Sequence, residues 1–167
     1  MEIDSLRKLY VEQLKDLHSA ERQIIQALPR MAKNSSNQQL RAAFEEHLEV
    51  TKKQVERLDQ IFEMLGKSSR GKKCKGMEGL IEEGKEVLEE DMEPEVRDAA
   101  LIAAAQKVEH YEIAGYGTVR TYAQLLGEDR HVKLLQQTLD EEGNTDKKLT
   151  ALAESSVNIE AAEPVEA

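Results

Sequence analysis

The sequence contains few of the residues that interrupt helices or build sheets. Its 167 residues include three Pro, nine Gly and no Trp, and aromatic residues make up only 4%. Proline and glycine break helices, whereas aromatic and β-branched residues favour strands. A chain of this length that is 40% hydrophobic can bury one substantial core. These features together argue against a sheet-rich fold and predict one domain of long helices.

Other scarcities bear on location and partners. The single cysteine, Cys74, cannot form an intramolecular disulfide. No run approaches the ~18 consecutive apolar residues of a membrane span, and the first residues lack the basic and apolar segments of a secretory signal. We therefore expect a cytoplasmic protein without a membrane role. The formal net charge of −10 argues against general binding to the phosphate backbone, so we expect no nucleic-acid partner.

Apolar residues at helical spacing predict four long helices. We expect them at about residues 6–32, 38–65, 94–126 and 129–154. The short turn at 34–37 makes the first two helices antiparallel neighbours. The long connection consists of a basic loop at 67–75, read as a solvated loop, and a short amphipathic helix at 77–88, and it can cross from one end of the bundle to the other. Residues 1–154 form the predicted domain, and residues 155–167 are predicted to be a disordered acidic tail.

Each long helix carries an ionisable residue where its apolar stripe requires an apolar one. At roughly 100° per residue, these four residues are Glu21, His47, Glu112 and Glu142. Asp146 follows Glu142 by about one turn, and Glu109 precedes Glu112 by about one turn at the edge of the inner face. Buried charges are costly unless they are paired or bind a metal, so these helices are predicted to share one centre.

The two halves of the chain echo each other, which supports two helix pairs around a common centre. Aligning Glu21 with Glu112, and His47 with Glu142, matches apolar positions on either side. Carboxylate-bridged metal bundles usually combine Glu on two helices with Glu-x-x-His on the other two. This sequence departs from that pattern, because Phe44 lies three residues before His47 and Thr145 three after Glu142. Any one of the inward residues alone would be read as a hydrogen-bonded core residue, and the four together favour a metal centre.

Several segments resemble the YciE/YciF family of bacterial ferritin-like proteins, over nearly all of the chain from Asp4 to Glu154. The segments are DLHSAERQ at 16–23, AFEEHLE at 43–49, CKGMEGL at 74–80, AQKVEHYEIAGYGT at 105–118 and TDKKLT at 145–150. The resemblance implies an all-α, ferritin-like four-helix bundle with a long crossover containing a short helix between the second and third long helices. It also implies a homodimer, a two-metal site and an association with bacterial stress responses. It does not imply an assigned reaction.

The leading hypothesis is a ferritin-like protein that binds two iron ions per chain, with manganese as the alternative metal. The predicted ligands are Glu21, His47, Glu109, Glu112, Glu142 and Asp146. Whether the protein is an enzyme stays open, and the class that fits is a ferroxidase or peroxidase-like oxidoreductase. The runner-up is a metal-free helical dimer with a structural or partner-binding role in stress. A small-molecule-binding bundle is weaker, because the inner face offers carboxylates without an obvious apolar cavity.

Overall fold

The computed structural model describes residues 2–163, and none of these residues lies in a strand. The elements, in chain order, are α1 (Leu6–Lys33), α2 (Gln38–Leu65), α3 (Lys75–Glu89), α4 (Pro94–Leu125), α5 (Asp129–Leu152), the π-helical turn η1 (Ala153–Val157) and α6 (Asn158–Ala162). The prediction of four long helices with a short fifth in the long connection is confirmed. None of the described helices contains a stretch apolar and long enough to cross a membrane.

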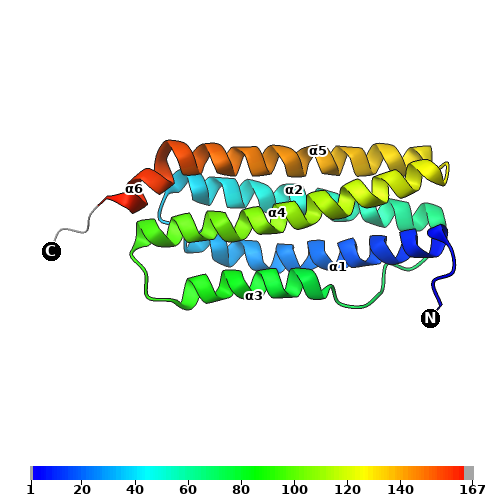
Figure 1. The fold of residues 1–167 in the computed structure, drawn as a ribbon, viewed down its shortest axis with the longest axis horizontal. Coiled ribbons are helices and arrows are strands. Elements are labelled where there is room, and N and C mark those ends of the chain that lie inside the picture. Colours follow the sequence, from blue (N-terminus) through cyan, green and yellow to red (C-terminus); the bar gives the residue numbers. More distant parts are fainter. Residues whose placement is uncertain (1, 164–167) are drawn as a thin grey trace.

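The four long helices lie side by side along the length of the molecule (Figure 1). α1 and α2 are antiparallel neighbours, as are α4 and α5. The segment containing α3 runs back along the outside of the bundle against α1 and α4, so that α4 runs in the same direction as α2. The predicted crossover is therefore confirmed, and the arrangement is that of a ferritin-like bundle.

Side-chain caps explain why the helices begin where they do. Ser5 Oγ accepts a hydrogen bond from the backbone N–H of Lys8 at 3.3 Å, and Asn37 Oδ1 accepts one from Leu40 at 3.0 Å. Both satisfy amide groups that the first helical turn leaves free. α2 ends at Gly66, whose φ of 63° lies in the left-handed region that a residue without a Cβ adopts at little cost. The local sequence thus determines these three boundaries.

The core consists of two apolar layers separated along the bundle. One includes Leu28, Phe44 and Leu101, and the other includes Tyr10 and Leu58. In each long helix, the inward ionisable residues lie at or next to the boundary between the segment that builds one layer and the segment that builds the other. The packing of apolar side chains on both sides keeps bulk water away from the middle of the bundle.

The C-terminal segment differs from its prediction. The structure continues helically from α5 through η1 and α6 to Ala162, whereas the sequence predicts a disordered tail from residue 155. Val157 explains the difference, because its side chain is 1% exposed and packs into the layer that contains Leu149. Residues 164–167 of the predicted tail lie outside the described residues.

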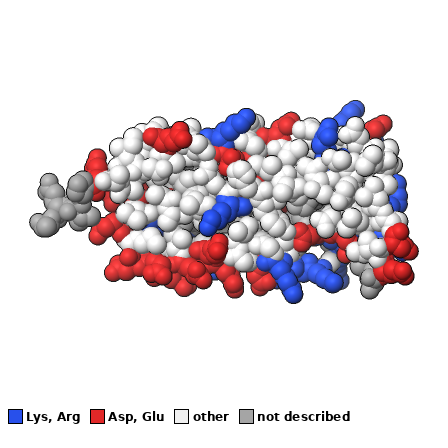
Figure 2. All heavy atoms as spheres, viewed as in Figure 1, with Lys and Arg blue, Asp and Glu red and all other residues white. Residues whose placement is uncertain are grey.

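The exposed acidic residues of α3 lie next to a basic group in the loop that precedes this helix. Figure 2 shows acidic side chains along the lower edge of the molecule, over α3 and the turn that follows it, next to a group of basic side chains. The exposed residues of α3 include Glu82, Glu83 and Glu86, and the basic group precedes this helix in the loop at 67–75. The basic loop is exposed apart from Ser69 and Cys74, in keeping with its reading as a solvated loop.

Candidate metal centre

Five ionisable side chains from the four long helices meet in the middle of the bundle. α1 supplies Glu21, α2 supplies His47, α4 supplies Glu109 and Glu112, and α5 supplies Glu142. Their exposed fractions are 0% for the first glutamate and for both on α4, 1% for Glu142 and 5% for His47. The helical phase explains the convergence, since each residue lies in the stripe that its helix turns inward.

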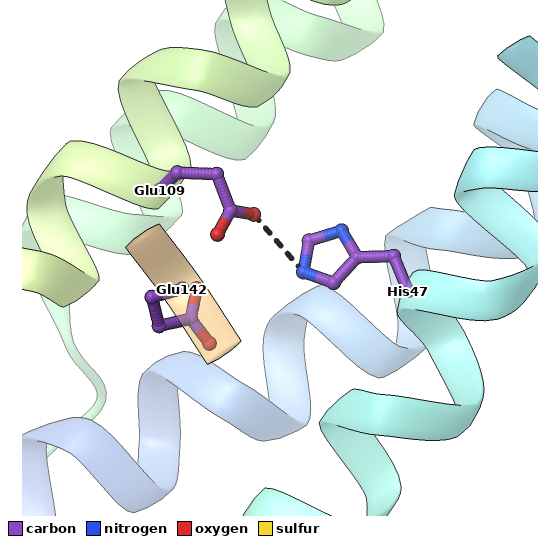
Figure 3. A group of neighbouring side chains, drawn as sticks. All are labelled: His47, Glu109 and Glu142. Atoms are coloured by element: carbon purple, nitrogen blue, oxygen red, sulfur yellow. Dashed lines mark ion pairs between the residues drawn. The ribbon is translucent and has the colours of Figure 1, made fainter. Parts of the chain in front are cut away.

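The side chains form two groups that share one member. His47, Glu109 and Glu142 can each offer one ligand atom, all within 4.8 Å of one another, and so can Glu21, Glu112 and Glu142. Metal–ligand bonds of roughly 2.0–2.6 Å place two ligand atoms on opposite sides of one ion about 4–5 Å apart. Figure 3 shows the first group, with the His47 ring and the Glu109 carboxylate pointing toward each other beside Glu142. Glu142 therefore belongs to both candidate groups.

Most polar atoms of this centre have no hydrogen-bond partner. Both carboxylate oxygens of Glu109, Glu112 and Glu142 lack one, as does Oε2 of Glu21. His47 Nε2 lies 3.0 Å from Glu109 Oε1, at ion-pair distance but without the geometry of a hydrogen bond. Buried polar groups in proteins are nearly always partnered. Oxygens left free in this way have the arrangement of ligands around a cation, so the residues present fit a metal centre.

Burial raises the pKa of every acid in the centre. The pKa of Glu21 rises from 4.5 to about 8, first through burial and then through the charge of Glu142. Burial likewise raises the pKa of Glu109 to about 7. The pKa values of Glu112 and Glu142 lie well above the ordinary value, because burial and neighbouring carboxylates both oppose ionisation. Without a cation, these acids hold protons near neutral pH.

The charges and donor types indicate which ions suit the centre. Burial lowers the pKa of His47, which keeps the ring neutral and able to act as a ligand. Two divalent cations carry four positive charges, which balances the four buried carboxylates. Carboxylate oxygens with one imidazole nitrogen suit iron and manganese better than they suit copper. The arrangement can therefore hold two such ions without excess charge in the core.

Tyr116 belongs to the centre, although the sequence reading does not identify it. Its hydroxyl donates a hydrogen bond to Glu21 Oε1 at 2.6 Å, and its side chain is 1% exposed. It lies one turn after Glu112 on the same face of α4. The spacing of four residues from Glu112 is the only feature of the sequence that indicates a role for Tyr116 in the centre. A tyrosine in an apolar stripe is ordinarily a core residue.

Asp146 is the one predicted ligand that the structure does not bring into either group of three. Its Oδ2 lies 3.3 Å from Nε2 of the exposed His110, and Gln106 Nε2 donates to its Oδ1 at 3.4 Å. Asp146 is half-buried between α5 and α4 at the edge of the centre. Its role as a metal ligand stays a prediction.

Comparisons with known proteins agree over nearly the whole chain. A family model described as "Domain of unknown function (DUF892)" matches residues 5–162. Protein YciF of Escherichia coli (strain K12) is 50% identical over 159 residues, which cover 95% of this chain and 96% of YciF. The crystal structure of the E. coli stress protein YciF matches with a TM-score of 0.90, over 93% of this chain and 99% of that one.

Two further solved structures extend the comparison. YcfI from Rhodopseudomonas palustris is 43% identical, with a TM-score of 0.87 over 89% of this chain and 95% of its own. A protein from Xanthomonas campestris pv. campestris has a TM-score of 0.75 over 94% of this chain and 96% of its own, at 20% identity. At that identity the likeness concerns the fold alone.

Proposed function

Because this chain belongs to the family described as a domain of unknown function (DUF892), we propose a function for it from its own centre together with its relationship to YciF. The predicted resemblance to the YciE/YciF family is confirmed. We propose that the protein is a ferritin-like metal-binding protein of the bacterial stress response. Its centre would hold two iron ions, or two manganese ions, and would handle iron or oxidants.

The observation that carries this proposal is the set of buried carboxylate oxygens without partners. Seven such oxygens belong to Glu21, Glu109, Glu112 and Glu142. Leaving buried polar groups unpartnered costs free energy, and carboxylates that crowd together repel one another when ionised. Two divalent ions would remove both penalties at once. Protons shared between neighbouring carboxyl groups would offset the same penalties, so metal content decides between the two states.

Each residue has a distinct task in the proposed centre. His47 and Glu109 would bind one ion, Glu21 and Glu112 the other, and Glu142 would lie between them. Bound iron supplies one-electron transfers, which would make oxidation of ferrous iron by peroxide or dioxygen the fitting reaction class. The Tyr116 hydroxyl holds the Glu21 carboxylate in one orientation, and the apolar layers exclude bulk water from all five ligands.

The homodimer and the cytoplasmic location stay predictions. The structure describes one chain, so the proposal concerns a centre whose five residues all come from that chain. Dimerisation would therefore affect the stability and partners of the protein without completing the centre. Sedimentation of the purified protein gives its mass in solution.

Metal content per chain tests the proposed function most directly. We expect about two ions per chain, the number a dinuclear carboxylate bundle holds, by elemental analysis after anaerobic loading with ferrous iron. Glu112→Gln keeps the side-chain shape and removes one ligand charge, so the bound metal should fall by at least one ion per chain while helix content persists. Glu45→Gln is the matched control, because Glu45 lies exposed on α2.

The contrary result would favour the metal-free alternative. If the wild-type protein holds no stoichiometric metal after loading, the raised pKa values describe a core of protonated acids that folds by itself. The protein would then be better described as a helical structural or partner-binding protein. Unchanged metal content in Glu112→Gln, with metal in the wild type, would instead remove Glu112 from the ligand set.

A further inference from the structure

A surface pocket between α2 and α5 leads to one member of the centre. The pocket, here called the α2–α5 pocket, has a volume of about 180 Å³. The buried side chains of Phe44 and His47 form its inner end, and the half-buried Val50 and Thr145 form part of its walls. Four other pockets on the described surface include none of the five centre residues. The α2–α5 pocket thus approaches the His47 side of the centre from the surface.

The two residues that differ from the usual Glu-x-x-His pattern, Phe44 and Thr145, both line this pocket. Phe44 takes the place that the usual pattern gives to a glutamate, and Thr145 the place that it gives to a histidine. An apolar ring replaces a ligand at the inner end, and a shorter side chain replaces a ring in the wall. Thr145 therefore leaves space that a histidine would fill, whereas Phe44 makes the pocket wall next to His47 apolar.

Two ion pairs join α2 to α5, and each includes at least one residue that lines the pocket. Arg57 Nη1 and Nη2 donate to the two carboxylate oxygens of Glu141 at 2.6 and 2.8 Å, and Lys148 pairs with Glu46. A bidentate arginine–carboxylate pair that is largely buried holds its geometry well. The Arg57–Glu141 pair helps to hold the two helices at the separation that leaves the pocket between them, whereas the exposed Lys148–Glu46 pair contributes little.

Size and charge select the kind of molecule that fits. At about 180 Å³, the pocket exceeds the ~10–15 Å³ that one water needs. It is smaller than the roughly 300–1,000 Å³ sites of drug-sized organic ligands. Each charged wall residue is paired with one of opposite sign, so the mouth carries no excess charge that would attract an ion.

We infer that the α2–α5 pocket is the route by which a small uncharged oxidant, of the hydrogen peroxide class, reaches the centre beside His47. The inference rests on the proposed function for the role of the oxidant. The route itself is a property of the chain, and it can be tested without metal. The reaction takes one electron from each of two ferrous ions, which become ferric, and two protons from the buffered solution. It breaks the O–O bond of one hydrogen peroxide molecule and yields two water molecules.

The first test uses metal-free protein and diethyl pyrocarbonate, a neutral reagent that has to pass through the pocket to reach the ring nitrogens of His47, both of which are buried. A neutral imidazole nitrogen attacks one carbonyl carbon of the reagent, and ethyl carbonate leaves. Peptide mass spectrometry follows the modification of His47, with the exposed His110 as an internal reference. Thr145→Phe should fill the pocket and slow modification of His47 by at least about tenfold, equivalent to a barrier higher by about 1.4 kcal/mol. Thr118→Phe places the same ring on the exposed face of α4 and should change nothing.

Val50→Phe obstructs the pocket from α2 instead of α5, so that the measurement can still be made if one of the two variants does not fold. Circular dichroism identifies the folded ones. In folded, iron-loaded variants, stopped-flow absorbance should show that peroxide oxidises the bound ferrous iron more slowly, while anaerobic iron uptake keeps its wild-type rate. This combination, together with slower modification of His47, supports the inference.

Three other outcomes separate the possible failures. Unchanged modification of His47 in both folded variants would overturn the route. Slower iron uptake with unchanged peroxide oxidation would overturn the choice of an uncharged molecule and make the pocket a cation route. If neither the wild type nor any folded variant binds iron, the proposed function and the oxidant's role fail together, while the metal-free result still decides whether the pocket leads to His47.

Discussion

At the scale of single residues, Tyr116 can be tested most directly, because its hydroxyl affects the pKa of one carboxyl group, that of Glu21. The hydrogen bond that it donates to Glu21 lowers the pKa of that acid, against the larger effect of burial. Tyr116→Phe should therefore raise the pKa of Glu21 above about 8. It should also lower the free energy of unfolding by about 1–3 kcal/mol, since a buried acceptor loses its donor. Carbon-13 NMR titration of the Glu21 carboxyl and urea denaturation measure the two effects.

The matched control for this prediction is Tyr122→Phe, which removes a hydroxyl about two turns further along α4. It should leave the titration of Glu21 where it is in the wild type. If Tyr116→Phe also leaves that titration unchanged, the hydroxyl does not position Glu21 in solution. Metal loading of the variant would then reveal whether the ligand is held in place by packing alone.

The phase of the helices predicts much of the centre at this scale. Glu21, His47, Glu112 and Glu142 each break an apolar stripe, and they meet because those stripes all turn inward. Tyr116 could not be recognised in the same way, because an aromatic residue does not break such a stripe. The pairing of Asp146 with His110 also could not be predicted, since it depends on how closely two edges of helices approach.

At the scale of elements, Asp98 connects α4 to the turn between α1 and α2. Its two carboxylate oxygens accept hydrogen bonds from the backbone N–H groups of Ser36 and Asn37, both at 2.8 Å. Asp98 is 2% exposed. Asp98→Ala should leave two amide groups without a charged acceptor, and we expect a loss of roughly 3 kcal/mol in the free energy of unfolding. Urea denaturation monitored by circular dichroism measures it.

Asp98→Asn serves as the comparison, because it keeps one acceptor oxygen in the same place. It should lose less stability than Asp98→Ala. Equal losses would mean that the charge, and not the number of acceptors, holds the turn. No measurable loss in either variant would show that the turn is fixed by its own caps, such as the bond from Leu40 to Asn37.

Local sequence predicts the helices better than the contacts between them. The starts at Leu6 and Gln38 follow from the caps at Ser5 and Asn37, and the crossover follows from the length of the connection. The link made by Asp98 joins residues about sixty positions apart, so no local pattern indicates it. The helical residues 155–162, which the sequence predicts to be disordered, depend on a similar long-range contact, because Val157 packs against residues from other elements.

At the scale of the whole molecule, the bundle keeps its hydrated surface charges apart from the ionisable groups buried in its middle. Its surface carries the acidic and basic groups that Figure 2 shows, all in contact with water. Its middle holds four carboxylates and one imidazole between two apolar layers, where ionisation is opposed by burial. In the proposed function, protons and metal ions would therefore compete for the same oxygens, and the free energy of unfolding would depend on which of them is bound.

This competition predicts opposite pH dependences for the two forms. In the metal-free protein, burial raises the pKa of Glu21 from 4.5 to about 8 and that of Glu109 from 4.5 to about 7. At a pH between the ordinary and the raised pKa, the folded state therefore binds more protons than the unfolded state. The free energy of unfolding should then fall by several kcal/mol from about pH 5 to pH 8, at about 1.4 kcal/mol per pKa unit. The lowered pKa of His47 has the opposite effect on stability below pH 6.5, its ordinary pKa. This single group is outweighed by the four glutamates, whose pKa values are raised.

In the metal-loaded protein the ligands are already deprotonated, so the same rise in pH should strengthen metal binding and keep or increase the stability. Urea denaturation of both forms at pH 5, 6.5 and 8 tests the pair of trends, and a pH indicator should register protons released when ferrous iron is added at pH 6.5. Parallel curves without proton release would mean that added iron does not displace protons from these oxygens. The free carboxylates of the centre would then be satisfied by protons shared among themselves.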